Sequence, residues 1–262
     1  MLKSAIRWAL NHIPRSWLQR MAGWAVPIMG IAYLGRGREC PICGAKRRKF
    51  LPYGYVTSRE DALCPKCLSL ERHRMIWLWM STTTLLEHRP RMLHIAPEVS
   101  LMRHFKRLYR NTSNYITADL ESPLADIHFD VQAIPLDDCS IDVVICNHLL
   151  EHVADDRKAM RELHRILCPG GLGIMLVPED RLRATTFEDD TITDAKERTR
   201  LFGQYDHRRI YGRDYDERLR DAGFVVERLN VDTIADETKR TLCSLGCDDM
   251  VIVHKPNLEN ND

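Results

Sequence analysis

From about residue 90 onward, short apolar segments alternate with segments whose apolar residues recur at helical spacing. This alternation constrains the fold more than any other feature, because it is typical of a mostly parallel sheet with helices on both faces. We therefore predict an α/β, doubly wound domain over residues 90–255, with its last two strands paired antiparallel at one edge. The predicted strands lie within residues 91–96, 115–120, 126–134, 141–147, 172–178, 224–231 and 248–256, and the predicted helices span 100–109, 155–167 and 214–221.

Polar residues follow the carboxyl ends of the first four predicted strands, where ligands bind in open sheets of this kind. The residues at these ends are Ala96, Pro97 and Glu98, then Asp119 and Leu120, then Asp130 and Val131, and lastly Asn147 and His148, of which the acids, Asn147 and His148 are the polar ones. A carboxylate such as that of Asp119 can accept hydrogen bonds from both hydroxyls of a ribose. A helix after the fourth strand is expected to begin at Asp155 or Asp156 and to be ended by Pro169–Gly171.

Four of the nine cysteines form two Cys-x-x-Cys pairs, Cys40 with Cys43 and Cys64 with Cys67. This spacing predicts a tetrahedral Zn²⁺ site in a ribbon-like module over residues 39–74, and four protein ligands would make the ion structural. Two disulfides are the alternative, but five further cysteines scattered along the chain favour a reducing, cytoplasmic compartment.

Charge is distributed unevenly along the chain. Residues 1–74 hold 14 Lys/Arg against 4 Asp/Glu, whereas the rest of the chain is acidic. Residues 1–38 form a basic arm in which apolar residues and tryptophans recur at helical spacing. Its longest apolar run, Met21–Leu34, has 14 residues, and a membrane span needs about 20. The arm, within residues 1–34, therefore either lies on the inner, anionic face of a membrane as a peripheral helix or packs on the protein's own body.

The central block, from Asp130 to Gly171, resembles class I S-adenosylmethionine-dependent methyltransferases of the type 11 group. The similarity rests on the motifs "DVQAIP", "IDVV", "LEHV" and "RILCPGG", which appear in order. It implies a Rossmann-like, seven-stranded sheet with an antiparallel last strand, and S-adenosyl-L-methionine as the cofactor. The whole chain resembles a bacterial subgroup with an N-terminal four-cysteine segment, "ERHR", "HIAPE" and "FGQ-x-DH".

The resemblance also assigns roles to individual residues. The family's first motif, an acidic residue followed by three alternating glycines, falls here on His94, Ala96, Glu98 and Ser100. We expect the Glu98 carboxylate either to turn outward to the cofactor's ammonium group or to swing clear of it. Asp119 matches the acid that binds the ribose, Asp130 and Val131 match the adenine segment, and Asn147 lies beneath the sulfonium.

Transfer to an O–H or N–H acceptor needs a base, and histidine suits this role near neutral pH. His148 follows the fourth strand, and His207 lies in a predicted lid or substrate loop beside Asp206, which could orient a hydroxyl. The predicted organisation is the arm, the zinc module, a linker helix over 75–89, the methyltransferase domain and a tail over 256–262. The acceptor is either a glycan, a lipid-linked sugar or small metabolite, or RNA bound through the zinc module. A non-catalytic scaffold is the third reading.

Overall fold

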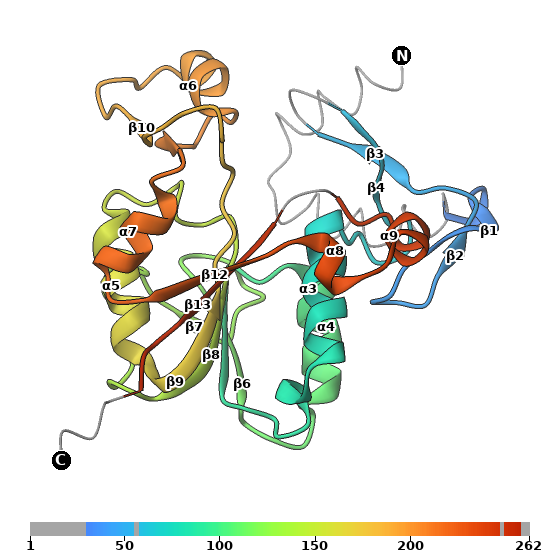
Figure 1. The fold of residues 1–262 in the computed structure, drawn as a ribbon, viewed down its shortest axis with the longest axis horizontal. Coiled ribbons are helices and arrows are strands. Elements are labelled where there is room, and N and C mark those ends of the chain that lie inside the picture. Colours follow the sequence, from blue (N-terminus) through green and yellow to red (C-terminus); the bar gives the residue numbers. More distant parts are fainter. Residues whose placement is uncertain (1–29, 55–57, 247–248, 258–262) are drawn as a thin grey trace.

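The computed structural model describes residues 30–54, 58–246 and 249–257, with a seven-stranded sheet at its centre (Figure 1). Residues 1–29 of the predicted arm lie outside the described residues, and residues 30–38 lie within them. The strands follow the order β12-β13-β9-β8-β5-β6-β7. β13 runs antiparallel to both of its neighbours, and the pairs from β9 to β7 are parallel, which confirms the predicted architecture. The strands are β5 (Met92–Ile95), β6 (Tyr115–Asp119), β7 (Ile127–His128), β8 (Ile141–Cys146), β9 (Leu167–Ile174), β12 (Val225–Leu229) and β13 (Met250–His254).

Helices cover both faces of the sheet (Figure 1). One face carries α3 (Glu71–Thr82) and α4 (Val99–Leu108), and the other carries α5 (Asp156–Ile166) and α7 (Tyr215–Asp221). Three short helices are associated with α3. η1 (Thr84–Leu86) follows it and α8 (Val231–Ile234) contacts it, while α9 (Glu237–Cys243) contacts α8. Each face is held by apolar stripes, as in α5, whose Ala159, Met160, Leu163 and Ile166 are buried.

Two expectations about α5 meet different outcomes. Asp155 caps the helix by accepting a hydrogen bond from the backbone N–H of Lys158, as predicted. The expectation that Pro169–Gly171 ends the helix is wrong, because α5 ends at Ile166 and these residues lie inside β9. There they interrupt the pairing with β8. Leu167 pairs with Ile141 and Leu172 pairs with Val143, so β9 advances by more residues than β8 between the two pairs. The Pro-Gly-Gly sequence therefore marks a bulge in a strand rather than a helix terminus.

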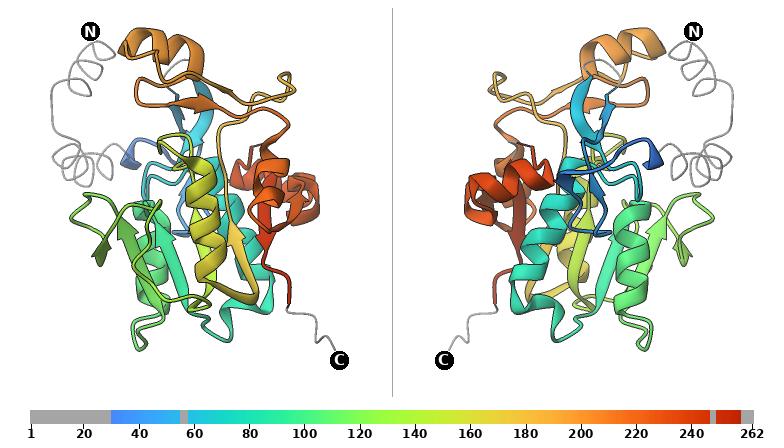
Figure 2. Two further views of the ribbon diagram at one scale, coloured as in Figure 1. Left: turned by 90° about the vertical axis from the view of Figure 1, so that its left-hand side faces the viewer. Right: turned by 90° about the vertical axis from the view of Figure 1, so that its right-hand side faces the viewer.

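The four-cysteine segment folds into two small antiparallel pairs, β1 (Leu34–Glu39) with β2 (Lys46–Arg47) and β3 (Leu51–Tyr53) with β4 (Arg59–Leu63). A second small unit is inserted after β9, with β10 (Phe187–Glu188), α6 (Ala195–Phe202) and β11 (Arg209–Ile210). Both units lie toward the same end of the sheet, the end at which the parallel strands finish (Figure 2).

None of the helices in the described part of the chain has the length and apolarity that a membrane span requires.

Candidate cofactor and catalytic site

The carboxyl ends of β5, β6 and β8 bring three candidate residues to one level. Ile95 pairs in parallel with both Ala118 and Cys146, so these residues form one row across the sheet. The residues that follow this row in the three strands are Ala96, Asp119 and Asn147. The register therefore places the predicted first motif, the ribose acid and the sulfonium-side asparagine together at one edge of the sheet.

Two residues leave this edge in a left-handed backbone conformation. Ala96 has φ +49° and His148 has φ +50°, and neither is a glycine. Each first extends the sheet by one hydrogen bond, from the Ala96 N–H to the Ala118 carbonyl and from the His148 N–H to the Leu176 carbonyl. A left-handed residue with a Cβ carries a cost of about 1–2 kcal/mol, and such strain gathers at functional sites. The chain thus turns sharply after β5 without a glycine at this position.

The Glu98 carboxylate turns inward, toward the row of strands. Its Oε2 lies 2.7 Å from His94 Nε2, and its Oε1 accepts a hydrogen bond from the Asn147 amide at 3.3 Å. Oε1 also lies 3.5 Å from His73 Nε2 on α3. Pro97, which precedes it, is half-buried at the turn between β5 and α4. The two oxygens are therefore held by protein groups.

A buried relay fixes this carboxylate as an anion. His94 is fully buried, and its Nδ1 lies 2.9 Å from the Tyr115 hydroxyl. Burial raises the pKa of Tyr115, so this phenol stays protonated and can donate to Nδ1, which leaves Nε2 as the donor to Glu98. Burial alone would raise the pKa of Glu98, but the neighbouring His73 and the hydrogen bond from His94 hold it well below its usual range.

Asp119 is the last residue of β6, and one of its carboxylate oxygens is engaged in hydrogen bonds with the following backbone. Its Oδ1 accepts the backbone N–H groups of Glu121 at 3.0 Å and Ser122 at 2.8 Å, which orients the carboxylate. Leu120, beside it, is 63% exposed. An oriented carboxylate next to an exposed apolar side chain is what a ribose and an adjoining base require.

Asp130 and Val131 follow β7 by two and three residues. Val131 is buried, whereas Asp130 is exposed and accepts hydrogen bonds from the backbone and side-chain amides of Gln132. The side chain of Gln132 in turn accepts from the Asp155 N–H. Asp130 is thus tied to the start of α5.

A second cluster gathers around Glu151, in the loop after β8. Glu151 is fully buried, and His148 Nδ1 lies 3.3 Å from its Oε1. The Nε2 atoms of His152 and His207 each lie 4.0 Å from the same oxygen. Asp206 faces the cluster from outside, with Oδ2 3.6 Å from His152 Nδ1. The structure therefore brings the three predicted catalytic residues, His148, Asp206 and His207, around one carboxylate.

A buried ionic network holds this cluster in place. The Arg209 guanidinium donates to the carbonyl oxygens of Leu150 and Val153, both at 2.7 Å, and to the carboxylate of Glu188 at 2.8 Å. Arg209 itself is 2% exposed, whereas its partner Glu188 lies at the surface. The loop that carries Glu151 is thereby fixed to the inserted unit that carries His207.

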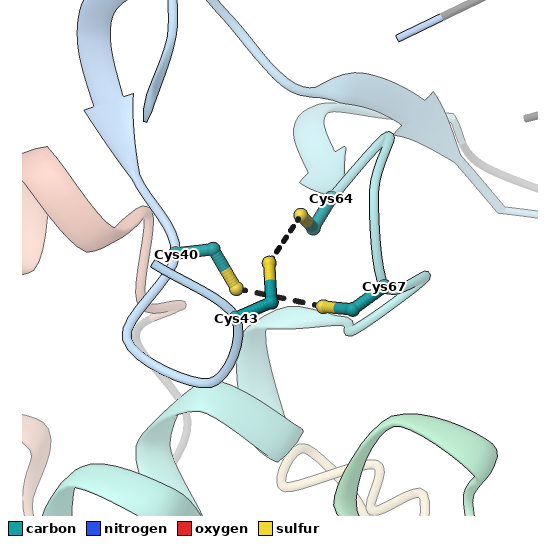
Figure 3. Close-up of side chains that lie close together, drawn as sticks. All are labelled: Cys40, Cys43, Cys64 and Cys67. Carbon is teal, nitrogen blue, oxygen red and sulfur yellow. Dashed lines mark hydrogen bonds between the residues drawn. The ribbon is translucent and has the colours of Figure 1, made fainter. Parts of the chain in front are cut away.

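The four cysteines of the N-terminal module meet, although they come from two separate turns (Figure 3). The two turns share one backbone pattern, in which the first cysteine's carbonyl accepts the N–H of the residue four positions later. These bonds run from Gly44 to Cys40 at 2.8 Å and from Leu68 to Cys64 at 2.9 Å. Gly44 and Leu68 both have positive φ, +65° and +62°. The sequence repeat is therefore a structural repeat.

The sulfur positions suit a tetrahedral ion. The Cys40 and Cys67 Sγ atoms lie 3.6 Å apart, and those of Cys43 and Cys64 lie 3.8 Å apart. Sulfurs about 2.3 Å from a tetrahedral Zn²⁺ are separated by about 3.8 Å, whereas a disulfide would bring them to about 2.05 Å. The described cysteines are all free thiols. The Ser69 hydroxyl, 3.3 Å from Cys40 Sγ and 3.2 Å from Cys67 Sγ, lies beside the cluster.

Arg74 joins the cysteine module to the rest of the molecule. Its buried guanidinium donates to the carbonyl oxygens of Ala62 and Ser69 in the module, and of Cys243 and Ser244 at the end of α9. The charge also lies over the Phe50 ring, 4.8 Å from its centroid. One cation therefore satisfies carbonyl groups from two segments that are far apart in sequence.

Sequence reasoning found most of these residues but missed three of the buried ones. Glu151, His73 and Tyr115 carry no pattern of their own, because a buried carboxylate, a helix histidine and a strand tyrosine are ordinary in a core. The only signal for Glu151 was its place in "LEHV", between two histidines.

Comparisons with known proteins agree with this geometry. Residues 80–175 match a family model described as a methyltransferase domain. Over 60 residues, 23% of this chain, the sequence is 40% identical to the demethylmenaquinone methyltransferase of Staphylococcus epidermidis. Over 106 residues, 40% of this chain, it is 30% identical to a probable S-adenosylmethionine-dependent methyltransferase of Mycolicibacterium smegmatis. The matches span only 24% and 37% of the length of these relatives.

Among solved structures, an S-adenosylmethionine-dependent methyltransferase of Mesorhizobium loti superposes with a TM-score of 0.44 at 15% identity. The superposition covers 64% of this chain and 95% of that one.

Residues 80–175, which match the methyltransferase domain model, contain strands β5 to β9 of the sheet, and the four-cysteine module precedes them in the chain.

Proposed function

We propose that the protein transfers a methyl group from S-adenosyl-L-methionine to an oxygen or nitrogen acceptor. The observation that carries the proposal is the row of strand ends, which sets Ala96, Asp119 and Asn147 side by side. A cofactor lying across this row would meet the Asp119 carboxylate at its ribose. Its reactive end would meet the turn that holds Glu98 and Asn147.

Glu98 supports the proposal in an unexpected way. The family's first motif relies on glycines, and a glutamate there would fill the space that glycines leave. Here the side chain is drawn under the turn by His94 and Asn147, so its bulk is directed into the protein. S-Adenosylmethionine has no pyrophosphate, and the need for bare backbone is correspondingly smaller.

His148 is the base that the geometry favours. Its Nδ1 faces the buried Glu151 carboxylate at 3.3 Å, and its side chain is 30% exposed at the end of β8. S-Adenosylmethionine, when bound, would supply the methyl group to the acceptor's oxygen or nitrogen and would leave as S-adenosylhomocysteine. His148 would take up the acceptor's proton, and the nearby Glu151 anion would stabilise the resulting imidazolium.

Calorimetry with S-adenosylhomocysteine tests the cofactor site without an acceptor. We expect Asp119→Ala to weaken binding at least tenfold, about 1.4 kcal/mol, because the ribose loses an anionic acceptor. Asp137→Ala is the matched control, since Asp137 is an exposed acid in the loop before β8. Absence of binding to the wild-type chain would remove the enzyme assignment and leave the scaffold reading.

We propose further that the four thiols bind one structural Zn²⁺. The fit of their spacing to a tetrahedron supports this proposal. The ion would be closed off by four protein ligands and would act on folding rather than on the reaction.

For the acceptor, the basic arm favours a substrate at an anionic surface, a lipid-linked sugar or glycan, over a free metabolite. RNA is the alternative, since Lys46, Arg47, Arg48 and Lys49 follow the first cysteine pair. The acidic composition of the catalytic part of the chain argues against a long phosphate track.

A further inference from the structure

Glu151 is a buried carboxylate that lacks the donors such a group normally requires. Its side chain is fully buried, and neither oxygen receives a hydrogen bond of normal geometry from the described residues. An unpaired buried charge costs several kcal/mol, so native proteins pair such groups or place them on metal ions. The main chain of Glu151 is fixed, since its backbone carbonyl accepts the Arg208 N–H at 2.8 Å.

His207 presents an acceptor, not a donor, to this carboxylate. Its Nδ1 lies 2.9 Å from the Phe202 carbonyl oxygen, which can only accept, so Nδ1 carries the proton. In the neutral imidazole, Nε2 then holds a lone pair, and Nε2 is the atom 4.0 Å from Glu151 Oε1. A histidine that donates one N–H to a backbone carbonyl and offers the other nitrogen is the usual arrangement of a metal ligand.

His152 repeats the arrangement with a carboxylate as its outer partner. Its Nδ1 faces Asp206 Oδ2 at 3.6 Å, which favours the proton on Nδ1, and its Nε2 lies 4.0 Å from Glu151 Oε1. The two rings meet edge to face, with centroids 4.8 Å apart. Two lone pairs and one carboxylate therefore converge on one point.

We propose that Glu151, His152 and His207 bind a divalent transition-metal ion. Besides His148, whose Nδ1 lies 3.3 Å from Glu151 Oε1, the carboxylate faces two further acceptors, and a positive charge between these three groups would stabilise them. Two imidazoles with one carboxylate suit zinc or iron better than magnesium or calcium. Three protein ligands leave a coordination position open, as in reactive metal sites rather than structural ones.

The present spacing is slightly wider than a bound site would have. The three ligand atoms lie within 4.8 Å of one another. Donors about 2.1 Å from a tetrahedral ion lie about 3.4 Å apart, so the ligands need to approach by roughly 1 Å. His152 lies in the turn that precedes α5, outside regular secondary structure. The site is independent of the four thiols, since the two sets of ligands share no residue.

Metal content of the full-length chain tests this proposal. After dialysis against micromolar Zn²⁺, the wild-type chain should hold one more zinc ion than the His207→Gln variant does. Cobalt(II) distinguishes the two sites, because the thiolate site gives an intense charge-transfer band that a nitrogen and oxygen site lacks. We expect His207→Gln to lose cobalt without losing this band.

His254→Gln is the matched control, because His254 Nε2 also lies near a glutamate, 3.1 Å from Glu227, but in no cluster of ligands. It should leave the zinc content unchanged. X-ray absorption of the zinc-loaded wild type gives a reading that does not depend on any variant, and it should contain a nitrogen and oxygen component. A wild-type spectrum with sulfur ligands alone would overturn the proposal. It would indicate that Glu151, His152 and His207 share a proton instead of a metal ion.

Discussion

Arg74→Met is expected to separate the cysteine module from the sheet. The guanidinium donates four hydrogen bonds of 2.6–3.0 Å to carbonyl oxygens, three of them at buried residues. Methionine has a similar length and no donor, so these carbonyls would lose their partner. A hydrogen bond to a charged group contributes about 1.5–3 kcal/mol, and breaking a buried charged network costs about 3–5 kcal/mol as a whole. We expect a loss at the upper end of that range, because both sides of the junction are affected.

Urea unfolding of the zinc-loaded chain measures this loss. About 4 kcal/mol corresponds to roughly a thousandfold change in the unfolding equilibrium. Arg72→Met is the control, since Arg72 lies in the same turn of α3 and its Nε has no hydrogen-bond partner. We expect its effect to stay below about 1 kcal/mol. Equal losses in the two variants would refute the reasoning, because the carbonyl contacts would then contribute nothing that helix packing does not.

Three further expectations concern the two cysteine turns, Glu98 in the first motif, and the arm. Gly44→Ala should destabilise the module by about 1 kcal/mol, because Gly44 has φ +65°, where a residue with a Cβ is strained. An added Cβ would meet no other atom, so this backbone strain is the whole effect. Leu68→Gly at the equivalent position should not destabilise the module. Thermal unfolding compares the two, and a neutral Gly44→Ala would contradict the strain argument. Because the pKa of Glu98 is depressed, its ionised form stabilises the fold above about pH 4.3, and this contribution is lost as the pH falls below that value. Glu98→Gln should therefore be less stable than the wild type at pH 7, with the gap closing in acid. Removal of residues 1–34 should abolish flotation with anionic vesicles, and equal flotation of both forms would leave the arm without a membrane role.

The sheet could be predicted from the sequence because each strand is a local apolar run and each helix has a local period. The register that aligns Ala96, Asp119 and Asn147 follows from such strands once they pair in parallel. The four thiols could also be predicted, since their spacing fixes the turn that presents them.

What could not be predicted depends on contacts between distant segments. The inward direction of Glu98 is set by His94 and by His73, which comes from a helix outside the predicted domain. The Pro-Gly-Gly sequence is typical of a helix end, yet β9 runs through it because its residues on both sides pair with β8. Glu151 becomes notable only when the inserted unit returns His207 to it, some fifty residues later in the chain.

The start of α3 has a consequence for how such chains can vary. His73 and Arg74 are neighbours, so their side chains leave the helix about 100° apart. One reaches Glu98 and the other reaches the carbonyls of the cysteine module. Inserting or deleting a single residue between Cys67 and His73 would shift the cysteine module relative to the start of α3, so Arg74 could no longer reach the module carbonyls while His73 faces Glu98. Variation in length should therefore accumulate elsewhere, while this short stretch keeps a constant number of residues wherever both contacts are retained.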